Sequence, residues 1–323
     1  MVKSTVLNGF FIGILCISFL FCGLAAETEN VEDKIARINR EIEENGWQWR
    51  AGRTELSDLT PEESKNLMGF HPLPEYIKET FPVYSRIDSI PLPEYFDWRD
   101  HAGATPAKHQ GDCGSCWAFA ATAQMESHTY IYDGRIEDYS EQAVMDCNDA
   151  GVGCGGGECT HAYQVFIDYG AVAESCVPYL ASSPHPCTQD SCESLARMSD
   201  FLVVPNTITE IKSAVYNEGP VFTSMYANSA MVNYVSGCYD TDYPEDPNHA
   251  VLIVGWDDNA CGGEGAWIIK NSWGTSWGYD GFGKIKYGVC SIGQGTYTID
   301  YASDDLYLHL ENPNGGETLH AGD

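Results

Sequence analysis

Two cysteines three residues apart, Cys113 and Cys116, stand in the stretch QGDCGSCWAF. Small and apolar residues recur at a helical period over residues 118–132, which predicts a buried helix that begins at Cys116. The free N–H groups and the positive end of the dipole at the start of a helix stabilise a thiolate and lower the pKa of its thiol. Cys116 is therefore a candidate nucleophile.

A cysteine that attacks a carbonyl also needs a base within reach and a donor for the oxyanion that forms. His249 opens an apolar run typical of a strand, and Asn271 closes another. Both lie more than 130 residues after Cys116, so only tertiary folding can bring the three together. Taken singly, His249 is equally typical of a core histidine and Asn271 of a turn residue.

Three motifs, QGDCGSCWAF, NHAVLIVGW and KNSWGTSWGYDGFGKI, follow one another in an order that resembles the papain-like cysteine peptidases. The resemblance covers most of residues 92 to about 301. It implies an α+β fold with a helical subdomain, a β-barrel-like subdomain and an active-site cleft between them.

The resemblance also implies a role for each residue of the site. Cys116 would be the nucleophile, His249 the base that becomes the acid, and Asn271 the group that orients His249. The Gln110 side chain and the Cys116 backbone N–H would form the oxyanion hole. Trp273 would shield the bond between Asn271 and His249 from water. An imidazolium beside a thiolate keeps the sulfur nucleophilic at mildly acidic to neutral pH.

The substrate-binding positions implied by the resemblance lie along the cleft: Gly114, Gly156, Gly157, Ala250, Trp273 and Gly295. Gly295 would form the floor of the S2 pocket, so no carboxylate there selects an arginine at P2, and a bulky apolar residue has room. Glu158 and Cys159 replace the aromatic and proline residues usual at the edge of this pocket. A disulfide at Cys159 would reshape that wall and weaken the expected P2 preference.

The chain has 13 cysteines, of which Cys16 and Cys22 lie in an N-terminal apolar run, so an odd number remains. This predicts up to five disulfides and one free thiol, which would be Cys116. The resemblance implies three pairs and leaves four cysteines unassigned. The pairs are Cys113 with Cys154, Cys147 with Cys187 and Cys238 with Cys290, and the unassigned cysteines are Cys159, Cys176, Cys192 and Cys261.

Two other interpretations of the cysteines come from spacing alone. A zinc ribbon would use four of them, Cys113, Cys116, Cys154 and Cys159. A redox dithiol would cycle Cys113 with Cys116, but the strand expected before CGSC is missing. A secretory leader with many cysteines favours disulfides instead, so we expect no metal and no other cofactor.

The N-terminal residues set the expected compartment. Lys3 precedes a long apolar run that ends in small residues, which is typical of a signal peptide over residues 1–26. The alternative is a membrane anchor, because the run is close to spanning length. Cleavage predicts a secreted protein, extracellular or in a lysosome-like acidic compartment, with no membrane association after removal of the leader.

The net charge of −30, from 17 Lys and Arg against 47 Asp and Glu, repels phosphate backbones and anionic lipid. Nucleic acid is therefore excluded as an expected partner. The expected partners are polypeptide substrates, and we expect a monomer.

Residues 27–91 contain no cysteine and form an expected inhibitory propeptide, followed by a peptidase domain over 92–302 and a tail or further domain over 303–323. Val31, Ile35, Ile38 and Ile42 predict a helix that ends near Gly46. A capping box, Thr60 with Glu63, predicts a second helix to about residue 68. The proline-rich residues 71–100 are expected to be extended. The segment resembles the short cathepsin B type of propeptide, which would lie through the cleft.

Further helices are predicted over residues 140–147, 160–170 and 208–216, and strand-like runs dominate after residue 200. The strand-like runs cover residues 201–205, 219–227, 250–258, 265–273, 281–287 and 296–301. The region 176–192 is short and holds only His185, which predicts an open cleft. The main hypothesis is therefore a secreted cysteine endopeptidase made as a zymogen. The alternatives are a catalytically silent papain-fold binding protein, although Cys116, His249 and Gln110 are all present, and a disulfide oxidoreductase.

Overall fold

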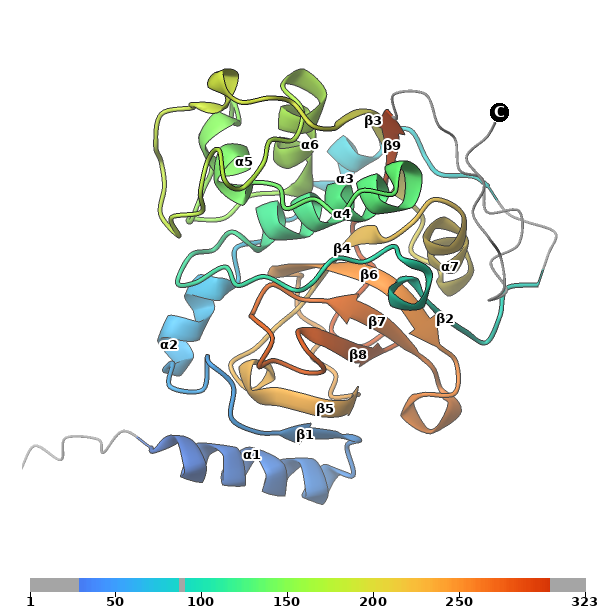
Figure 1. Cartoon of the computed structure of the whole chain (residues 1–323). Helices are drawn as coiled ribbons and strands as arrows, with labels where there is room; N and C mark the ends of the chain where they lie inside the picture. The colour runs from blue at the N-terminus through green and yellow to red at the C-terminus, as the bar shows by residue number, and fades with distance from the viewer. Residues whose placement is uncertain (1–28, 87–90, 303–323) are drawn as a thin grey trace, which may run out of the picture.

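The computed structural model describes residues 29–86 and 91–302. The expected signal peptide (1–26) and C-terminal tail (303–323) lie outside the described residues. A group of helices stands over a twisted mixed sheet, as Figure 1 shows, which confirms the α+β fold with two subdomains. Within the described ranges, no helix is long and apolar enough to cross a membrane.

The helical subdomain is built around α4 (Cys116–Asp133), with α5 (Glu141–Cys147) and α6 (Cys159–Asp168) packed against it. Fifteen side chains of α4 are buried, since α5 and α6 cover one side of the helix and β6 (His249–Asp257) the other. The three helices begin close to the predicted positions. Ser140 caps α5 by accepting the N–H of Ala143.

The sheet holds nine strands of the described chain in the order β1-β5-β8-β7-β6-β4-β9-β3, with β2 paired to β6. Six strands fall where the sequence predicted them: β3 (Arg197–Val204), β4 (Val221–Met225), β6, β7 (Ala266–Lys270), β8 (Phe282–Lys286) and β9 (Thr296–Ala302). Three others were missed: β1 (Trp49–Ala51), β2 (Tyr95–Asp97) and β5 (Tyr234–Tyr239). β1 and β2 are three residues long, so they present little period-two alternation. β5 has six residues but contains Ser236 and Gly237, and glycine is uncommon in strands. The helix α7 (Ile208–Asn217) packs on β6, and β6 is buried along almost its whole length.

Short 3₁₀ turns link these elements: η1 (Lys65–Leu67), η2 (Trp98–His101), η3 (Gln189–Ser191), η4 (Met231–Asn233) and η5 (Cys261–Gly263).

The N-terminal segment, residues 29–86, begins with α1 (Val31–Asn45), which ends at a left-handed Gly46 as expected. The predicted capping box of Thr60 and Glu63 opens α2 (Pro61–Ser64), and η1 continues it. The expectation that residues 71–100 are wholly extended is wrong, because α3 (Glu75–Lys78) lies there. Pro74 precedes α3 with a φ of −55°, a value that suits the start of a helix.

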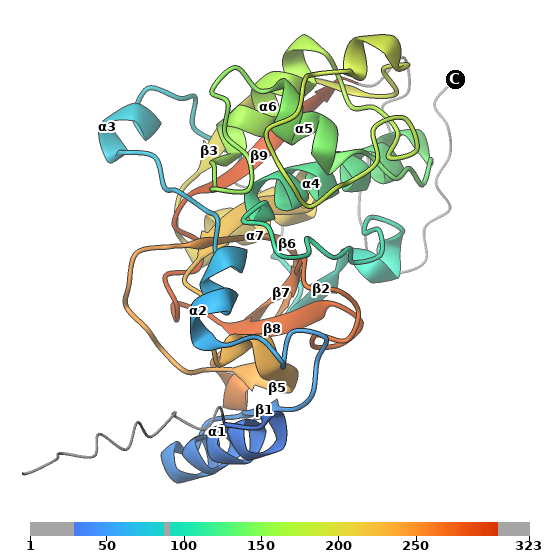
Figure 2. The ribbon, with the colours of Figure 1, turned by 90° about the vertical axis from the view of Figure 1, so that its left-hand side faces the viewer.

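The N-terminal segment crosses the whole molecule. Its strand β1 pairs antiparallel with β5, and the indole N–H of Trp49 donates to Thr241 Oγ1 at 2.9 Å. At the other end Tyr84 N–H donates to Val203 O at 2.8 Å, on the edge strand β3. Figure 2 shows α2 near the boundary of the two subdomains and α3 projecting beside the helical subdomain.

Four disulfides lie within the described residues: Cys113–Cys154, Cys147–Cys187, Cys176–Cys192 and Cys238–Cys261. The first two match the expected pairs. The third and fourth join cysteines that the sequence left unassigned, except that Cys238 was expected to pair with Cys290.

The expected pairing of Cys238 with Cys290 is wrong. Cys238 lies on β5, and its Cα is 5.4 Å from that of Cys261, in the turn that follows β6. The Cys290 thiol instead points to the carbonyl of Thr241 at 3.2 Å. Cys290, Cys116 and Cys159 are the free cysteines of the described chain, so the expectation of one free thiol is also wrong.

Candidate active site

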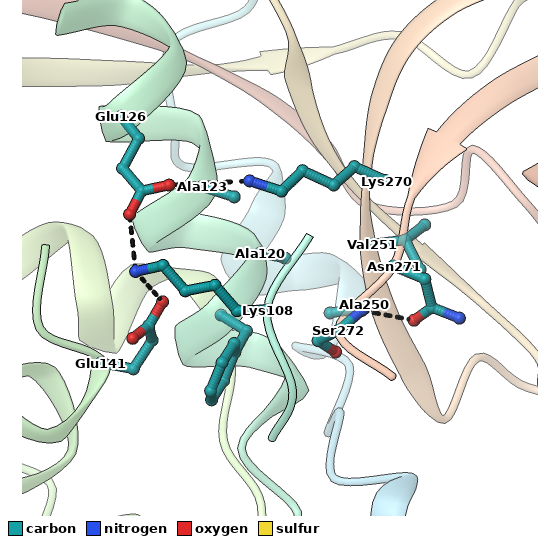
Figure 3. A pocket seen from close by; sticks show the side chains of 11 residues that line it. Lys108, Ala120, Ala123, Glu126, Glu141, Ala250, Val251, Lys270, Asn271 and Ser272 are labelled. Carbon is teal, nitrogen blue, oxygen red and sulfur yellow. Dashed lines mark hydrogen bonds and ion pairs between the residues drawn. The ribbon is translucent and has the colours of Figure 1, made fainter. Parts of the chain in front are cut away.

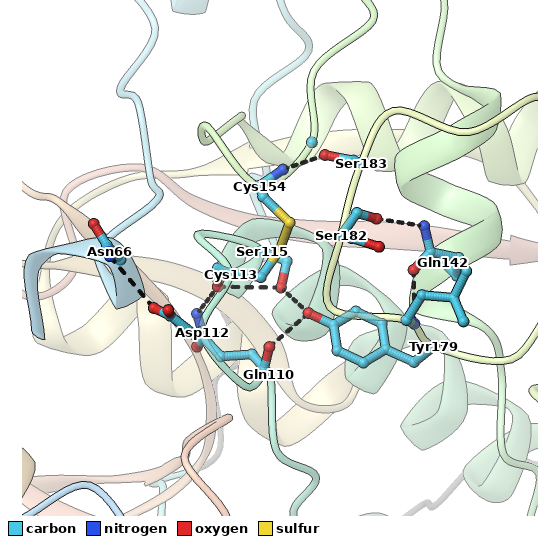
Figure 4. The surroundings of a disulfide bond; sticks show 12 residues. Asn66, Gln110, Asp112, Cys113, Ser115, Gln142, Cys154, Tyr179, Ser182 and Ser183 are labelled. Carbon is cyan, nitrogen blue, oxygen red and sulfur yellow. Dashed lines mark hydrogen bonds between the residues drawn. A yellow bond between two sulfur atoms is a disulfide. The ribbon is translucent and has the colours of Figure 1, made fainter. Parts of the chain in front are cut away.

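Cys116 is the first residue of α4 and is completely buried. The Cys113–Cys154 disulfide and a bond from Gly114 N–H to Cys154 O at 3.0 Å fix the preceding loop. Figure 4 shows the disulfide beside the loop that carries Gln110. Because Cys113 and Cys154 are bonded to each other, neither the zinc ribbon nor a cycling pair of Cys113 and Cys116 fits. Among the described residues, no group of His, Cys, Asp and Glu is arranged to hold a metal ion.

His249 and Asn271 come together because β6 and β7 are antiparallel neighbours. His249 is the first residue of β6, and Asn271 directly follows β7. His249 Nε2 lies 2.9 Å from Asn271 Oδ1, and the ring of Trp273 stacks on the imidazole with 4.6 Å between centroids. His249 Nδ1 is buried and has no hydrogen-bond partner. The structure thus places these three predicted residues in one cluster, with one imidazole nitrogen anchored and the other available.

Gln110 connects the loop before Cys116 to the end of β7. Its side-chain oxygen accepts from Ser272 Oγ at 2.7 Å, and its backbone N–H donates to Ser272 O at 2.9 Å. The side-chain nitrogen donates to Cys113 O at 2.7 Å and to Leu67 O at 3.0 Å. The amide group of Gln110 is therefore oriented by Ser272 and holds a peptide carbonyl of the N-terminal segment.

The N-terminal segment occupies the cleft through backbone contacts to Gly157. Gly157 N–H donates to Gly69 O and His71 N–H donates to Gly157 O, both at 2.9 Å. Phe70 forms an isolated parallel bridge with Gly157. A Cβ at Gly157 would lie 2.7 Å from the ring of Trp117, and a Cβ at Gly69 only 1.8 Å from Gly114 O. Glycines on both sides therefore permit the close approach.

Burial has the largest effect on the ionisation of Cys116 and His249. Burial raises the pKa of the Cys116 thiol to about 11, although backbone N–H groups of Ala250, Gly69 and Trp117 oppose the shift. Burial also lowers the pKa of His249 to about 4, although the side chain of Asn271 and the backbone of Leu67 both oppose the shift. At neutral pH burial therefore favours a neutral thiol and a neutral imidazole, although the direct contacts of Gly69 and Leu67 act in the opposite direction.

The site and its fold match those of known proteins. The model of the papain family cysteine protease matches residues 92–299. The chain belongs to this family.

Among curated papain-family relatives, the viral cathepsin of Heliothis zea nuclear polyhedrosis virus is 38% identical over 208 residues, 63% of this chain and 55% of that protein. Falcipain-3 of Plasmodium falciparum is 31% identical over 77% of this chain and 56% of its own length. The chain thus spans little more than half of these two relatives. Cathepsin S of Rattus norvegicus is 34% identical over 72% of each chain.

Solved structures of papain-family proforms superpose on the chain. The digestive procathepsin L 3 of Tenebrio molitor larval midgut gives a TM-score of 0.73 at 30% identity, over 83% of this chain and 88% of that one. The procathepsin B S9 of Trypanosoma congolense gives 0.71 at 23% identity over 83% and 98%, which shows a shared fold. The superposition extends beyond residues 92–299 in both, and the cathepsin B type of the propeptide stays a prediction.

Phe70 is buried in an apolar cluster beside Gly157. Its ring lies 6.0 Å from that of Phe222 and belongs to a buried cluster that includes Ala250 and Tyr297. A Cβ at Gly295 would meet Tyr297 at 3.8 Å. Gly295 and Ala250 therefore lie around the group of aromatic rings that surrounds the side chain of Phe70.

The two residues that depart from the papain-family pattern, Glu158 and Cys159, form the start of α6. The buried Glu158 carboxylate caps the helix, accepting the N–H of Thr160 at 2.8 Å. Cys159 makes no disulfide, and its thiol donates to Glu158 Oε1 at 3.0 Å. Burial raises the pKa of Cys159, and the Glu158 charge raises it further. No disulfide at Cys159 therefore reshapes the edge of the expected S2 pocket. The Cys159 thiol stays protonated.

A buried ionic network behind the site was missed by the sequence analysis. Figure 3 shows Glu126 of α4 between two lysines. Its carboxylate lies 2.7 Å from Lys108 Nζ and 3.6 Å from Lys270 Nζ, and Glu141 of α5 lies 3.0 Å from Lys108. Burial raises the pKa of Glu141 to about 8, whereas for Glu126 the lysine charges outweigh burial and lower the pKa. Lys270 directly precedes Asn271, so the network ties the helical subdomain to the strand that ends at the site. The available signal was a lone acidic residue inside the apolar pattern of α4.

Proposed function

We propose that the chain is the zymogen of a cysteine endopeptidase that hydrolyses polypeptides through Cys116, His249 and Asn271. The observation that carries the proposal is the Leu67 carbonyl held by the Gln110 amide. The donor expected to bind the oxyanion thus already binds a peptide carbonyl. This donor belongs to the loop that directly precedes Cys116, the first residue of α4.

The chemistry needs each group where it lies. The Cys116 proton moves to His249 Nδ1, and the thiolate attacks the scissile carbonyl carbon. Gln110 Nε2 and the Cys116 N–H stabilise the oxyanion. The imidazolium then gives its proton to the leaving amine, which leaves an acyl-enzyme. Water attacks the thioester while His249 takes its proton, and the thiol is regenerated as the acid product leaves.

Asn271 supports this proton transfer by fixing the ring. Its side-chain oxygen accepts the Nε2 proton of His249, which leaves Nδ1 as the nitrogen that exchanges a proton with Cys116. Trp273, stacked on the same ring, keeps water from this bond. Both contacts hold the imidazole in a single tautomer and orientation.

We assign residues 27–91 as the inhibitory propeptide, after a signal peptide over 1–26 and before a peptidase domain over 92–302 and a tail over 303–323. The bonds of Gly69 and His71 to Gly157 support a segment that occupies the substrate path. The acidic surface and the expected leader support a secreted monomer, extracellular or in a lysosome-like compartment.

The side chain of Phe70 supports a preference for a bulky apolar residue at P2. It lies buried in one cluster with Phe222, Tyr297 and Ala250. Gly295 lies next to Tyr297, and a Cβ there would also meet Ser224 Oγ at 3.3 Å. An apolar side chain of a substrate would gain the same burial after the propeptide has left.

Labelling with an epoxide or iodoacetamide probe, followed by peptide mapping and a peptidase assay, tests this function. Cys116 is expected to carry the label after propeptide removal, and Cys116→Ala to lose both label and activity. Cys290→Ala is the matched control, because this free thiol is buried against Thr241 and should leave activity unchanged. Peptidase activity in Cys116→Ala would refute the proposal, and a wild type that never cleaves peptides would favour a silent binding protein.

A further inference from the structure

Tyr179 touches both ends of the loop that carries the candidate nucleophile. It lies in the region between Cys176 and Cys192, which a disulfide closes. Its hydroxyl donates to the backbone carbonyl of Gln110 at 2.7 Å and lies 2.6 Å from Ser115 Oγ. Figure 4 shows this phenol between the two residues. Because the single phenolic proton goes to Gln110, the Ser115 hydroxyl is the donor in its 2.6 Å contact with the phenol oxygen. Its other acceptor, the Cys113 carbonyl, is farther away at 3.5 Å.

Ser115 is the N-cap residue of α4, yet it does not cap the helix. A serine at this position usually accepts a hydrogen bond from an N–H of the first turn. Here the Ser115 side chain makes no such bond, and its backbone φ and ψ of −101° and 14° are not the extended values of a capping residue. The N–H groups of Cys116 and Trp117 instead act on the Cys116 sulfur, where they lower the pKa of its thiol.

We infer that Tyr179 is a positioning residue that holds the Ser115 hydroxyl away from the helix start and so leaves the first N–H groups of α4 to the thiolate and the oxyanion. The same phenol fixes the backbone of Gln110, whose side chain is the second oxyanion donor. The inference rests on the proposed role of Cys116 as nucleophile.

The surroundings of Tyr179 suit a fixed donor. Its ring meets Phe119 of α4 edge-on, with centroids 4.8 Å apart. Its backbone N–H donates to Glu174 Oε1, and the next N–H, of Leu180, donates to Gln142 Oε1 of α5. Burial raises the pKa of the phenol, and the charges of Glu141, Cys116 and Glu174 act in the same direction. The hydroxyl therefore stays protonated throughout the working range of pH.

The test compares Tyr179→Phe with wild type after propeptide removal. The measurements are the pH profile of Cys116 alkylation by iodoacetamide, together with kcat and KM on one peptide substrate. Without the bond to Tyr179, Ser115 should adopt the extended backbone of a capping residue, and its hydroxyl should then compete for the N–H groups of α4. We expect the alkylation rate on the acidic limb of the profile and kcat each to fall about tenfold, because a hydrogen bond to a charged group is lost. KM should stay within about twofold of the wild-type value. Tyr169→Phe, an exposed tyrosine at the end of α6, is the matched control and should match wild type.

The serine separates this effect from a structural one. The double variant Ser115→Ala with Tyr179→Phe has no hydroxyl to cap the helix, so its alkylation profile should return to within about twofold of wild type. If Tyr179 only supported the loop, the double variant would be no better than Tyr179→Phe, and the inference would be overturned.

Ser115→Ala alone gives an answer that does not depend on the folding of Tyr179→Phe. If Tyr179 already holds the Ser115 hydroxyl away from the helix, Ser115→Ala should leave the acidic limb of the alkylation profile unchanged. If the hydroxyl caps α4 in the wild type, its removal should raise the alkylation rate at acidic pH, and that result would contradict the inference. A wild type that hydrolyses peptides and shows coincident profiles in all variants would overturn the inference alone. A wild type without label at Cys116 would overturn the proposed function as well.

Discussion

The carbonyl oxygen of Leu67 lies 3.0 Å from the side-chain nitrogen of Gln110 and accepts its hydrogen bond. Ser272 holds the oxygen of the same amide at 2.7 Å, so the direction of the nitrogen is set by the enzyme domain and not by the propeptide. In the proposed function, the N-terminal segment thus occupies the donor that would bind the reacting carbonyl of a substrate. If the proposed function holds, inhibition and catalysis depend on one shared donor.

Gln110→Ala should weaken both processes. Loss of an oxyanion donor is expected to lower kcat/KM by about 100-fold. The affinity for a separate peptide of residues 27–91 should fall about fivefold, because one neutral hydrogen bond is lost. Steady-state kinetics and inhibition titrations measure the two effects. Gln164→Ala, an exposed glutamine on α6, is the control, and an inhibition constant unaffected by Gln110→Ala would contradict the shared donor.

Propeptide binding should suppress the thiolate of Cys116. A thiol with a pKa near 11 is protonated at pH 7, since an acid stays protonated below its pKa. Addition of the 27–91 peptide to the activated enzyme should slow iodoacetamide alkylation at pH 7 by at least about 100-fold. The rate in the complex should climb as the pH rises from 7 toward 11. A rate that stays flat over this range would indicate steric exclusion alone.

Gly69→Ala should release the propeptide. The new Cβ would lie 1.8 Å from Gly114 O, a distance that forces the segment away from Cys116. We expect inhibition by the 27–91 peptide to weaken at least about tenfold, in line with the cost of overpacking a tight contact. Gly46→Ala in the same peptide meets no atom within 4 Å and serves as control, with only the strain of its left-handed backbone. Equal inhibition by both variants would place the segment elsewhere.

Glu126→Gln should destabilise the enzyme domain by about 3 kcal/mol, because Lys108 and Lys270 would lose their shared buried counter-charge. Thermal unfolding of the full chain in wild type and variant measures the change. Glu62→Gln removes an exposed partner of Lys65 and should stay within about 0.5 kcal/mol of wild type. A similar melting temperature for Glu126→Gln would show that the network contributes nothing to stability.

Local patterns were sufficient to predict the elements that present the candidate catalytic residues. The helical period that begins at Cys116 and the apolar runs beside His249 and Asn271 each lie within one element, so their structure follows from neighbouring residues. The capping box of Thr60 and Glu63 was likewise readable, because both partners are three residues apart.

Contacts between distant segments were not readable in this way. Tyr179 reaches Gln110 across 69 residues, and the pattern around it is that of an ordinary loop. Cys238 pairs with Cys261 because the turn after β6 brings Cys261 next to β5. The papain-family pattern suggested Cys290 instead. Lys108 and Lys270, the partners of Glu126, likewise lie far from it in the sequence. The sequence around Glu126 therefore shows an acidic residue in an apolar helix without its partners.

The N-terminal segment pairs with β5 at one end of the sheet and with β3 at the other. Its removal exposes the backbone donors and acceptors of two edge strands that were formed against it. An enzyme that has lost the segment therefore has no template for either edge if it unfolds. We therefore expect the lifetime of the activated enzyme to be set by its rate of unfolding.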